Sequence, residues 1–238
     1  MSKLFSFWPR SPLSATLGFV ILDIFFGYLH YLNGWTYHMF NLDVEHNLPT
    51  LYQGAKYFVL AWICWFLTYY YAQTRRVPKR TFWGLLALTL TWLGLDELGM
   101  LHEFLLDVYL VELFPAWEAW QRTQILTRGY SPESSRWIIS YAVLALCTLP
   151  LSLHWLNLGR RLYARRLWPL GIALVLLVGV VGLEYYGTSG VFGRYYNRII
   201  SFEEGFEMVA ISIAGLFVFG EFWPTHRRVR ALLRLDCE

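Results

Sequence analysis

Charge is scarce in this sequence. Charged residues make up 16% of its 238 positions, whereas a soluble domain carries about 25%. Cysteine is scarce as well, with three residues and no Cys-x-x-Cys pair, which argues against a disulfide framework and a thiolate metal site. No polar stretch is long enough for a separate soluble domain. We therefore expect residues 1–238 to form a single integral membrane domain.

Apolar residues are abundant, at 56% of the chain. They gather in runs of about the length that a helix needs to cross a bilayer. The runs predict transmembrane helices at roughly 13–35, 55–72, 82–108, 137–157, 167–187 and 199–222. The expected fold is therefore all-α: a polytopic, multipass bundle of six transmembrane helices.

Basic residues are unevenly distributed along the chain. Most of the 20 lysines and arginines flank the predicted helices on one side, and such residues stay on the cytoplasmic side of a membrane. Both termini are therefore expected in the cytoplasm. The run between Arg227 and Arg234 is interpreted as part of this bias, so we expect no nucleic-acid partner. The residues that carry the bias are Lys3, Arg10, Arg75, Arg76, Lys79, Arg80, Arg160, Arg161, Arg165, Arg166, Arg227, Arg228, Arg230 and Arg234.

Two short acidic segments lie inside predicted transmembrane helices, Asp96-Glu97-x4-His102-Glu103 and Glu203-Glu204-x2-Glu207. A charged side chain at the centre of a bilayer costs about 2.5–3.5 kcal/mol on insertion scales, so these residues are expected to have a function. A helix rises about 1.5 Å per residue, which places both segments in the outer half of the membrane. We therefore expect the two acidic faces to meet across the bundle.

Several carboxylates in a low-dielectric site cannot all stay ionised without compensation. Three explanations follow. A divalent metal ion binds, with iron, manganese or zinc suited to carboxylate and imidazole ligands. Alternatively, Arg194 and Arg198 neutralise the acids in a structural network, or the acids share protons on a transport path. We favour the metal.

Two further groups of polar residues have both a structural and a functional interpretation. Asp23 and His30 share one face of the first helix, so they either extend the acidic site or form hydrogen-bonded pairs between helices. The segment Asn47-Leu48-Pro49-Thr50 either belongs to the site or caps the second helix, with the proline in its first turn.

Three familiar motifs are incomplete. Gly187-Thr188-Ser189-Gly190 resembles the serine motif of rhomboid proteases, but the last predicted helix has no histidine. Glu203-Glu204 is similar to the start of the EExxxR motif of membrane CAAX-type proteases, but position 208 is methionine. Glu97 and His102 are five residues apart, unlike the Glu-x-x-His of di-iron bundles.

One resemblance fits all its motifs. The blocks Leu42-Asp43-x-Glu45-x-Asn47-Leu48-Pro49-Thr50, Leu95-Asp96-Glu97-x4-His102-Glu103 and Glu203-Glu204-x2-Glu207-Met208 resemble an uncharacterised family of bacterial multipass membrane proteins. The resemblance implies a bacterial inner (plasma) membrane location. It also implies that Asp43, Glu45 and Asn47 act with the other acids, but it supplies no activity.

The expected function is that of a metal-binding membrane protein, an oxidoreductase or hydrolase acting on a lipid-like or quinone-like molecule from the periplasmic side. The expected metal ligands are Asp96, Glu103, Glu203, Glu207, Glu97, Glu45 and Asp43. His102 and Glu204 are expected to be catalytic, as ligand or general base. The alternatives are a proton- or cation-coupled transporter or channel, and a non-catalytic assembly or sensor protein. Membrane lipid is the expected partner in each case.

Overall fold

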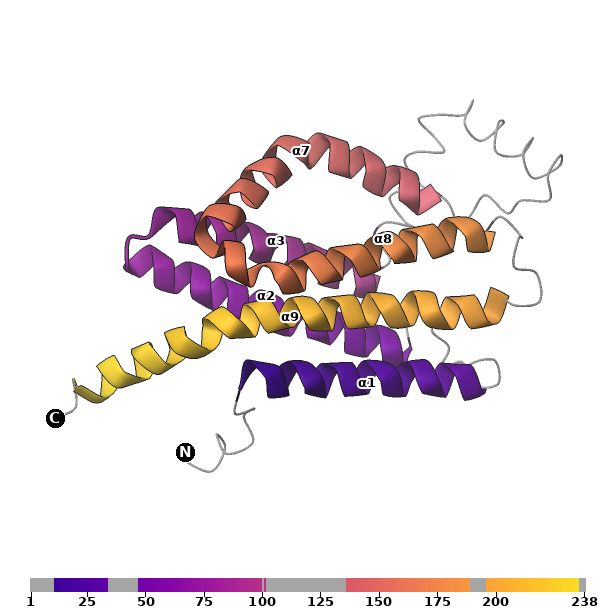
Figure 1. The fold of residues 1–238 in the computed structure, drawn as a ribbon, viewed down its shortest axis with the longest axis horizontal. Helices are drawn as coiled ribbons and strands as arrows, with labels where there is room; N and C mark the ends of the chain where they lie inside the picture. The colour runs from indigo at the N-terminus through magenta and orange to yellow at the C-terminus, as the bar shows by residue number, and fades with distance from the viewer. Residues whose placement is uncertain (1–10, 34–46, 100, 102–135, 189–195, 236–238) are drawn as a thin grey trace.

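The structure is a computed structural model that describes residues 11–33, 47–99, 101, 136–188 and 196–235. In these residues the chain forms six α-helices and a short 3-10 turn, η4, so the all-α prediction is confirmed (Figure 1). The elements are α1 (Pro12–Asn33), α2 (Leu48–Gln73), α3 (Val77–Gly99), α7 (Arg136–Tyr163), η4 (Ala164–Arg166), α8 (Trp168–Thr188) and α9 (Tyr196–Leu235).

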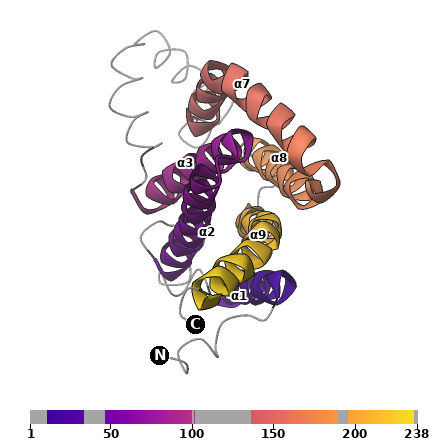
Figure 2. The ribbon, with the colours of Figure 1, turned by 90° about the vertical axis from the view of Figure 1, so that its left-hand side faces the viewer.

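The helices alternate in direction along the bundle. As a result, α1 begins and α9 ends at the same end of the molecule (Figure 1). We call this the terminal end, and the end where α1 finishes and α9 starts the opposite end. Seen along the bundle, α9 lies between α1 and α8, and the antiparallel pair α2–α3 packs beside them, with α7 at the edge (Figure 2).

The chemistry of the helix ends explains two of the boundaries. The side chain of Asn47 accepts a hydrogen bond from the backbone N–H of Thr50 at 3.1 Å, and Pro49 lies in the first turn. The predicted cap of this helix is therefore confirmed. At its other end, Arg75 takes a left-handed conformation with φ of 54°, and Arg76 N–H bonds Tyr71 O at 2.9 Å, which closes the helix in a Schellman turn.

The predicted helix boundaries differ from the observed ones where a helix continues beyond its apolar run into polar sequence. α2 begins at Leu48 instead of residue 55, because its first turns are polar but capped. α9 continues to Leu235, well beyond residue 222, because backbone hydrogen bonding does not require apolar side chains. The predicted helix 82–108 begins earlier, at Val77, and its part beyond Gly99 lies mostly outside the described residues.

Length and composition support fewer membrane spans than the six predicted. In the described residues, α1 and α9 each contain a segment long and apolar enough to cross a membrane, and the bent pair α7–α8 makes a third if it counts as one span. Polar residues such as Lys56 on α2 and Asp96 on α3 lower the mean hydropathy of the other helices. Two or three such helices still indicate a membrane protein.

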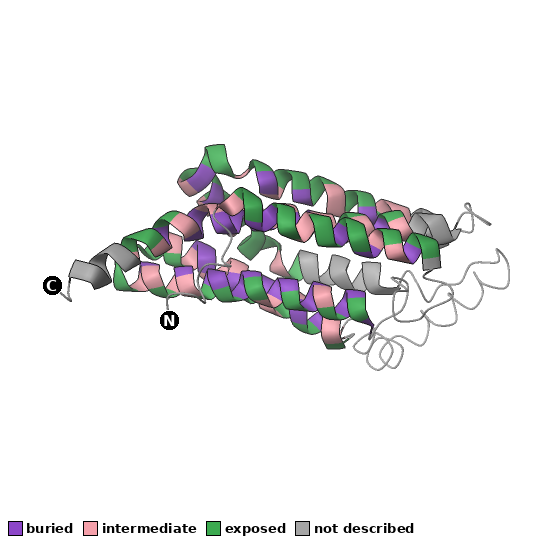
Figure 3. Cartoon of the chain, turned by 90° about the horizontal axis from the view of Figure 1, so that it is seen from below, coloured by how far each residue is buried: buried purple, intermediate pink, exposed green. Residues whose placement is uncertain are grey.

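Large apolar side chains cover the outward faces of several helices. Figure 3 shows buried and exposed residues alternating along the coloured parts of the helices. Ile21 and Ile24 on α1, and Val175 and Val178 on α8, are each more than 60% exposed. Contiguous apolar surface of this kind marks contact with a membrane or another protein, which agrees with the composition of these helices.

The apolar core fills the terminal half of the bundle. Leu60, Ile63, Cys64 and Leu67 on α2 are completely buried, and aromatic rings from four helices pack beside them. Trp83 stacks on Phe217 with ring centroids 5.3 Å apart. The opposite half of the bundle, by contrast, contains most of the buried polar residues described below.

Candidate functional site

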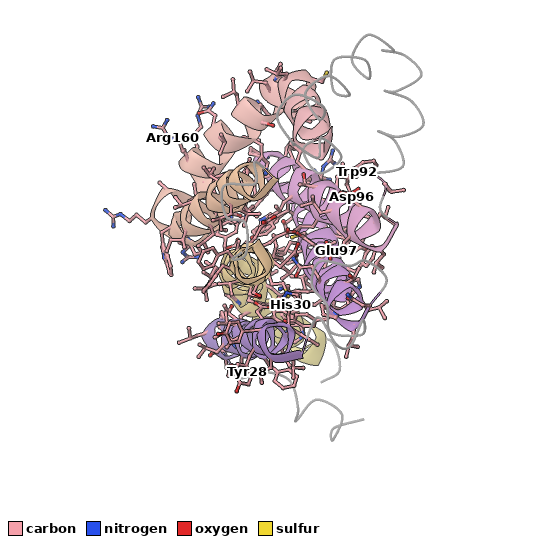
Figure 4. All side chains as sticks on the ribbon, turned by 90° about the vertical axis from the view of Figure 1, so that its right-hand side faces the viewer. Tyr28, His30, Trp92, Asp96, Glu97 and Arg160 are labelled. Atoms are coloured by element: carbon pink, nitrogen blue, oxygen red, sulfur yellow. The ribbon has the colours of Figure 1, made fainter. Side chains whose placement is uncertain are left out.

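The two acidic segments predicted to form a site lie at the opposite end of the bundle. Asp96 and Glu97 are near the end of the described part of α3, and Glu203, Glu204 and Glu207 are near the start of α9. Asp96 and Glu203 are buried, and the other three are half-buried. Figure 4, viewed from this end, places Glu97 in the interior between the helices.

Lys56 connects these acidic segments. Glu97 on α3 and Glu207 on α9 both lie within electrostatic range of the Lys56 ammonium on α2. Glu207 also accepts a hydrogen bond from Tyr57 Oη at 3.3 Å. Carboxylates on α3 and α9 therefore both interact electrostatically with one cation on α2.

The Lys56 ammonium is fully hydrogen-bonded. Nζ donates to Asp23 Oδ1 at 2.8 Å, to the backbone O of Met208 at 2.7 Å and to Ser212 Oγ at 3.2 Å. An ammonium has three donors, so these acceptors use all of them. The three bonds join α1, α2 and α9. Lys56 is therefore a structural connection between helices, with no N–H left for a bound molecule.

Asp23 is satisfied in the same way. Besides Lys56, its carboxylate accepts hydrogen bonds from Tyr52 Oη at 2.8 Å and Ser212 Oγ at 2.5 Å. Neither side chain of the Asp23–Lys56 pair is exposed. A buried ion pair persists only when its remaining polar atoms are bonded as well, and here they are. Of the two interpretations of Asp23, the pair between helices is confirmed.

Other buried polar residues lie at the same end. His30, near the end of α1, is completely buried and lies in the interior of the bundle (Figure 4). Gln53 lies one turn before Lys56 on α2 and is 3% exposed. Within the part of the chain that the structure describes, neither amide atom of Gln53 has a hydrogen-bond partner. A buried amide without partners is costly, so Gln53 is suited to contact a bound molecule.

Four of the predicted site residues, Asp43, Glu45, His102 and Glu103, lie outside the described residues. Arg194, one of the two arginines considered as neutralising partners, lies outside them too. Among the residues that are described, no three His, Cys, Asp or Glu side chains are grouped closely enough to hold a metal ion. A complete metal site would therefore need ligands from the segments 34–46 or 102–135.

A second charged cluster, which the sequence interpretation missed, lies at the terminal end. Glu221 on α9 accepts a hydrogen bond from Lys79 Nζ at 2.8 Å and a short one from Tyr71 Oη. Tyr163 Oη lies 3.4 Å from the same carboxylate oxygen and accepts a hydrogen bond from Trp83 Nε1 at 2.8 Å. The signal in the sequence was an acid on the predicted cytoplasmic side, where most charged residues are basic.

The buried apolar layer formed by Leu60, Ile63, Cys64 and Leu67 on α2 lies between Lys56 and Tyr71. Since a helix rises about 1.5 Å per residue, these two residues are roughly 22 Å apart along α2. The clusters around Lys56 and Glu221 are therefore separate, and the first is positioned to be reached from the opposite end of the bundle.

Comparisons with curated proteins and with solved structures each gave no significant match. A family model described as "Domain of unknown function (DUF8692)" matches residues 16–220. This range contains all three sequence blocks that carried the resemblance and the cluster around Lys56, and it ends one residue before Glu221. The chain therefore belongs to this family of unknown function.

Proposed function

We propose that this protein is a multipass membrane protein with all six helices crossing the bilayer, and that it binds a divalent metal ion at the opposite end of the bundle. The site is proposed to act on a lipid-like or quinone-like molecule dissolved in the outer leaflet. On this proposal the opposite end faces the periplasm of a bacterial inner membrane, because the flanking lysines and arginines gather at the terminal end.

One observation carries the proposal. Glu97 of α3 and Glu207 of α9 lie within electrostatic range of the same Lys56 ammonium, although 110 positions separate them in sequence. Since Lys56 donates all its hydrogen bonds to Asp23, Met208 and Ser212, its ammonium has no N–H left with which to occupy the site. The Asp23–Lys56 pair would thus form a rigid inner boundary of the site, next to the carboxylates.

The proposed ligand set combines described and undescribed residues. Asp96, Glu97, Glu203 and Glu207 offer hard oxygen donors, but no three of them lie close enough together to share an ion in the described structure. Glu103, Asp43 and Glu45 would complete the ligand set. His102 and Glu204 would act as ligand or general base. A metal in such a site polarises a bound oxygen or lowers the pKa of a bound water, which suits hydrolysis as well as redox chemistry.

The test is elemental analysis of the full chain, purified in detergent and loaded separately with iron, manganese and zinc. The wild-type protein is expected to retain one metal in stoichiometric amount, and a Glu203→Gln/Glu207→Gln variant to lose it. Glu221→Gln is the matched control, since it makes the same change on the same helix in the other cluster. Wild-type protein that retains no metal under any loading condition would overturn the proposal.

A second candidate is a proton- or cation-coupled transporter. The completely buried Asp23–Lys56 pair favours it, since ionisable residues inside membrane helices commonly mark proton relays and ion paths. The apolar layer between the two clusters opposes a continuous path in this conformation. Proton or cation flux in liposomes, abolished by Asp23→Asn, would support transport, and a liposome assay without flux would count against it.

A further inference from the structure

A cleft lies at the terminal end of the bundle, far from the proposed metal site. It has a volume of about 290 Å³ and is lined by residues from the start of α3, the end of α7, the turn η4 and α9. Its walls contain both charged and apolar side chains, namely those of Lys79, Leu162, Tyr163, Ala164, Arg165, Arg166 and Glu221.

The cleft carries an excess of positive charge. Three cations line it against one carboxylate. Glu221 binds Lys79 at 2.8 Å, and the ammonium also lies over the rings of Tyr71 and Tyr163, at 4.8 and 5.0 Å. Lys79 is thereby held in place at the wall of the cleft.

The two arginines are less constrained. The Arg166 guanidinium lies 3.6 Å from Glu221, beyond hydrogen-bond distance, and its side chain is 70% exposed. Arg165 is exposed as well. A guanidinium offers five N–H donors in a planar fork that matches the oxygens of a phosphate. Glu221 therefore does not satisfy the Arg166 guanidinium. The two adjacent arginines remain able to bind an anion.

Apolar side chains are exposed on α8, which begins two residues after the cleft-lining Arg166. Trp168, the first residue of α8, is 57% exposed, and tryptophan is typical of the membrane–water interface. Ile172 and Val175, one and two turns further, are exposed too. A molecule with an anionic head at the arginines and an apolar tail along α8 would contact both surfaces.

We propose that this cleft binds a phosphate group, and that the group belongs to the headgroup of an anionic phospholipid. Basic pockets between membrane helices on the cytoplasmic side are suited to anionic headgroups. The proposal uses the topology proposed above but is independent of the metal site, because the two sites are at different ends of the bundle.

The experiment compares two pairs of arginines from the same basic run. Arg165→Gln/Arg166→Gln removes the pair in the cleft, and Arg160→Gln/Arg161→Gln removes the same charge from α7, where Arg160 projects away from the bundle (Figure 4). The full-length proteins, in detergent, are titrated with phosphatidylglycerol, phosphatidylcholine and inorganic phosphate, and dissociation constants are measured.

The wild-type protein is expected to prefer phosphatidylglycerol over phosphatidylcholine. The cleft variant should bind phosphatidylglycerol about 30-fold more weakly, since each of the two arginines strengthens attraction to anionic lipid about five- to sixfold and the two factors multiply. The α7 variant should stay within about threefold of wild type. Phosphate binding alone, lost in the cleft variant, would support the site with a soluble ligand as its source. Equal weakening by both variants, or no binding by the wild type, would overturn the proposal.

Discussion

Lys56 and Asp23 form an ion pair at 2.8 Å in which neither side chain is exposed. The pair joins α1 to α2, and the bonds of Lys56 to Met208 and Ser212 join both helices to α9. Three helices are thus fixed to one another by a single ammonium. This relationship determines the geometry on which the proposed site depends.

Breaking this pair from one side should be costly. Lys56→Met leaves the Asp23 carboxylate buried without its cation, and removing one partner of a buried pair costs about 3–5 kcal/mol. The free energy of unfolding, measured by denaturant titration in detergent, should fall by that amount. Asp23→Leu/Lys56→Met removes both charges and should recover most of the loss. If the double variant is less stable than Lys56→Met, the ion pair is not the source of the effect.

Gln53 is expected to lower the stability of the protein while it favours binding. Neither of its amide atoms is hydrogen-bonded within the described residues, so Gln53→Met, of similar shape, should raise the free energy of unfolding by about 1–3 kcal/mol. Metal retention or substrate binding should weaken in the same variant. Gln73→Met, an exposed position at the end of α2, is the matched control and should change neither. A loss of stability in Gln53→Met would show that the amide is already satisfied.

The helices themselves were largely predictable, because long apolar runs report membrane helices directly. The apolar runs did not predict where each helix ends. The Asn47 cap and the extension of α9 to Leu235 depend on backbone hydrogen bonds, which hydropathy does not record. The polar residues of α2 and α3 also make those helices less apolar than the span prediction assumed.

The site was predictable in part. Helical spacing and charge bias placed the acids of α3 and α9 at one depth, and the structure places Glu97 and Glu207 near one ammonium. The identity of that cation was missed. In the sequence, Lys56 is only a basic residue near the start of an apolar run, and its pairing with Asp23, 33 positions away, depends on how two helices pack. Arginines were considered instead because they directly precede the acids.

Close contact between α2 and α3 depends on Gly94. A Cβ atom built there would lie 3.1 Å from the Cβ of Tyr57, which is attached to the backbone and cannot move aside. Gly94→Ala should therefore destabilise the protein by about 1–3 kcal/mol and displace the neighbouring Tyr57–Glu207 bond. At Gly84 the nearest atom would be 3.5 Å away, so Gly84→Ala should be neutral or stabilising by up to about 1 kcal/mol. Equal melting temperatures for the two variants would contradict the packing argument.

The Glu221 cluster should contribute to stability without contributing to the proposed metal site. Glu221→Gln removes the ion pair with Lys79 and weakens the bond from Tyr71, and a hydrogen bond to a charged group contributes about 1.5–3 kcal/mol. Because the Lys79 side chain is 22% exposed, solvent screening should bring the loss toward the lower end of that range. Thermal unfolding in detergent measures the loss, and metal content in the same preparation should equal that of the wild type. A variant that lost metal but kept its stability would show that the two clusters are coupled through the apolar layer between them.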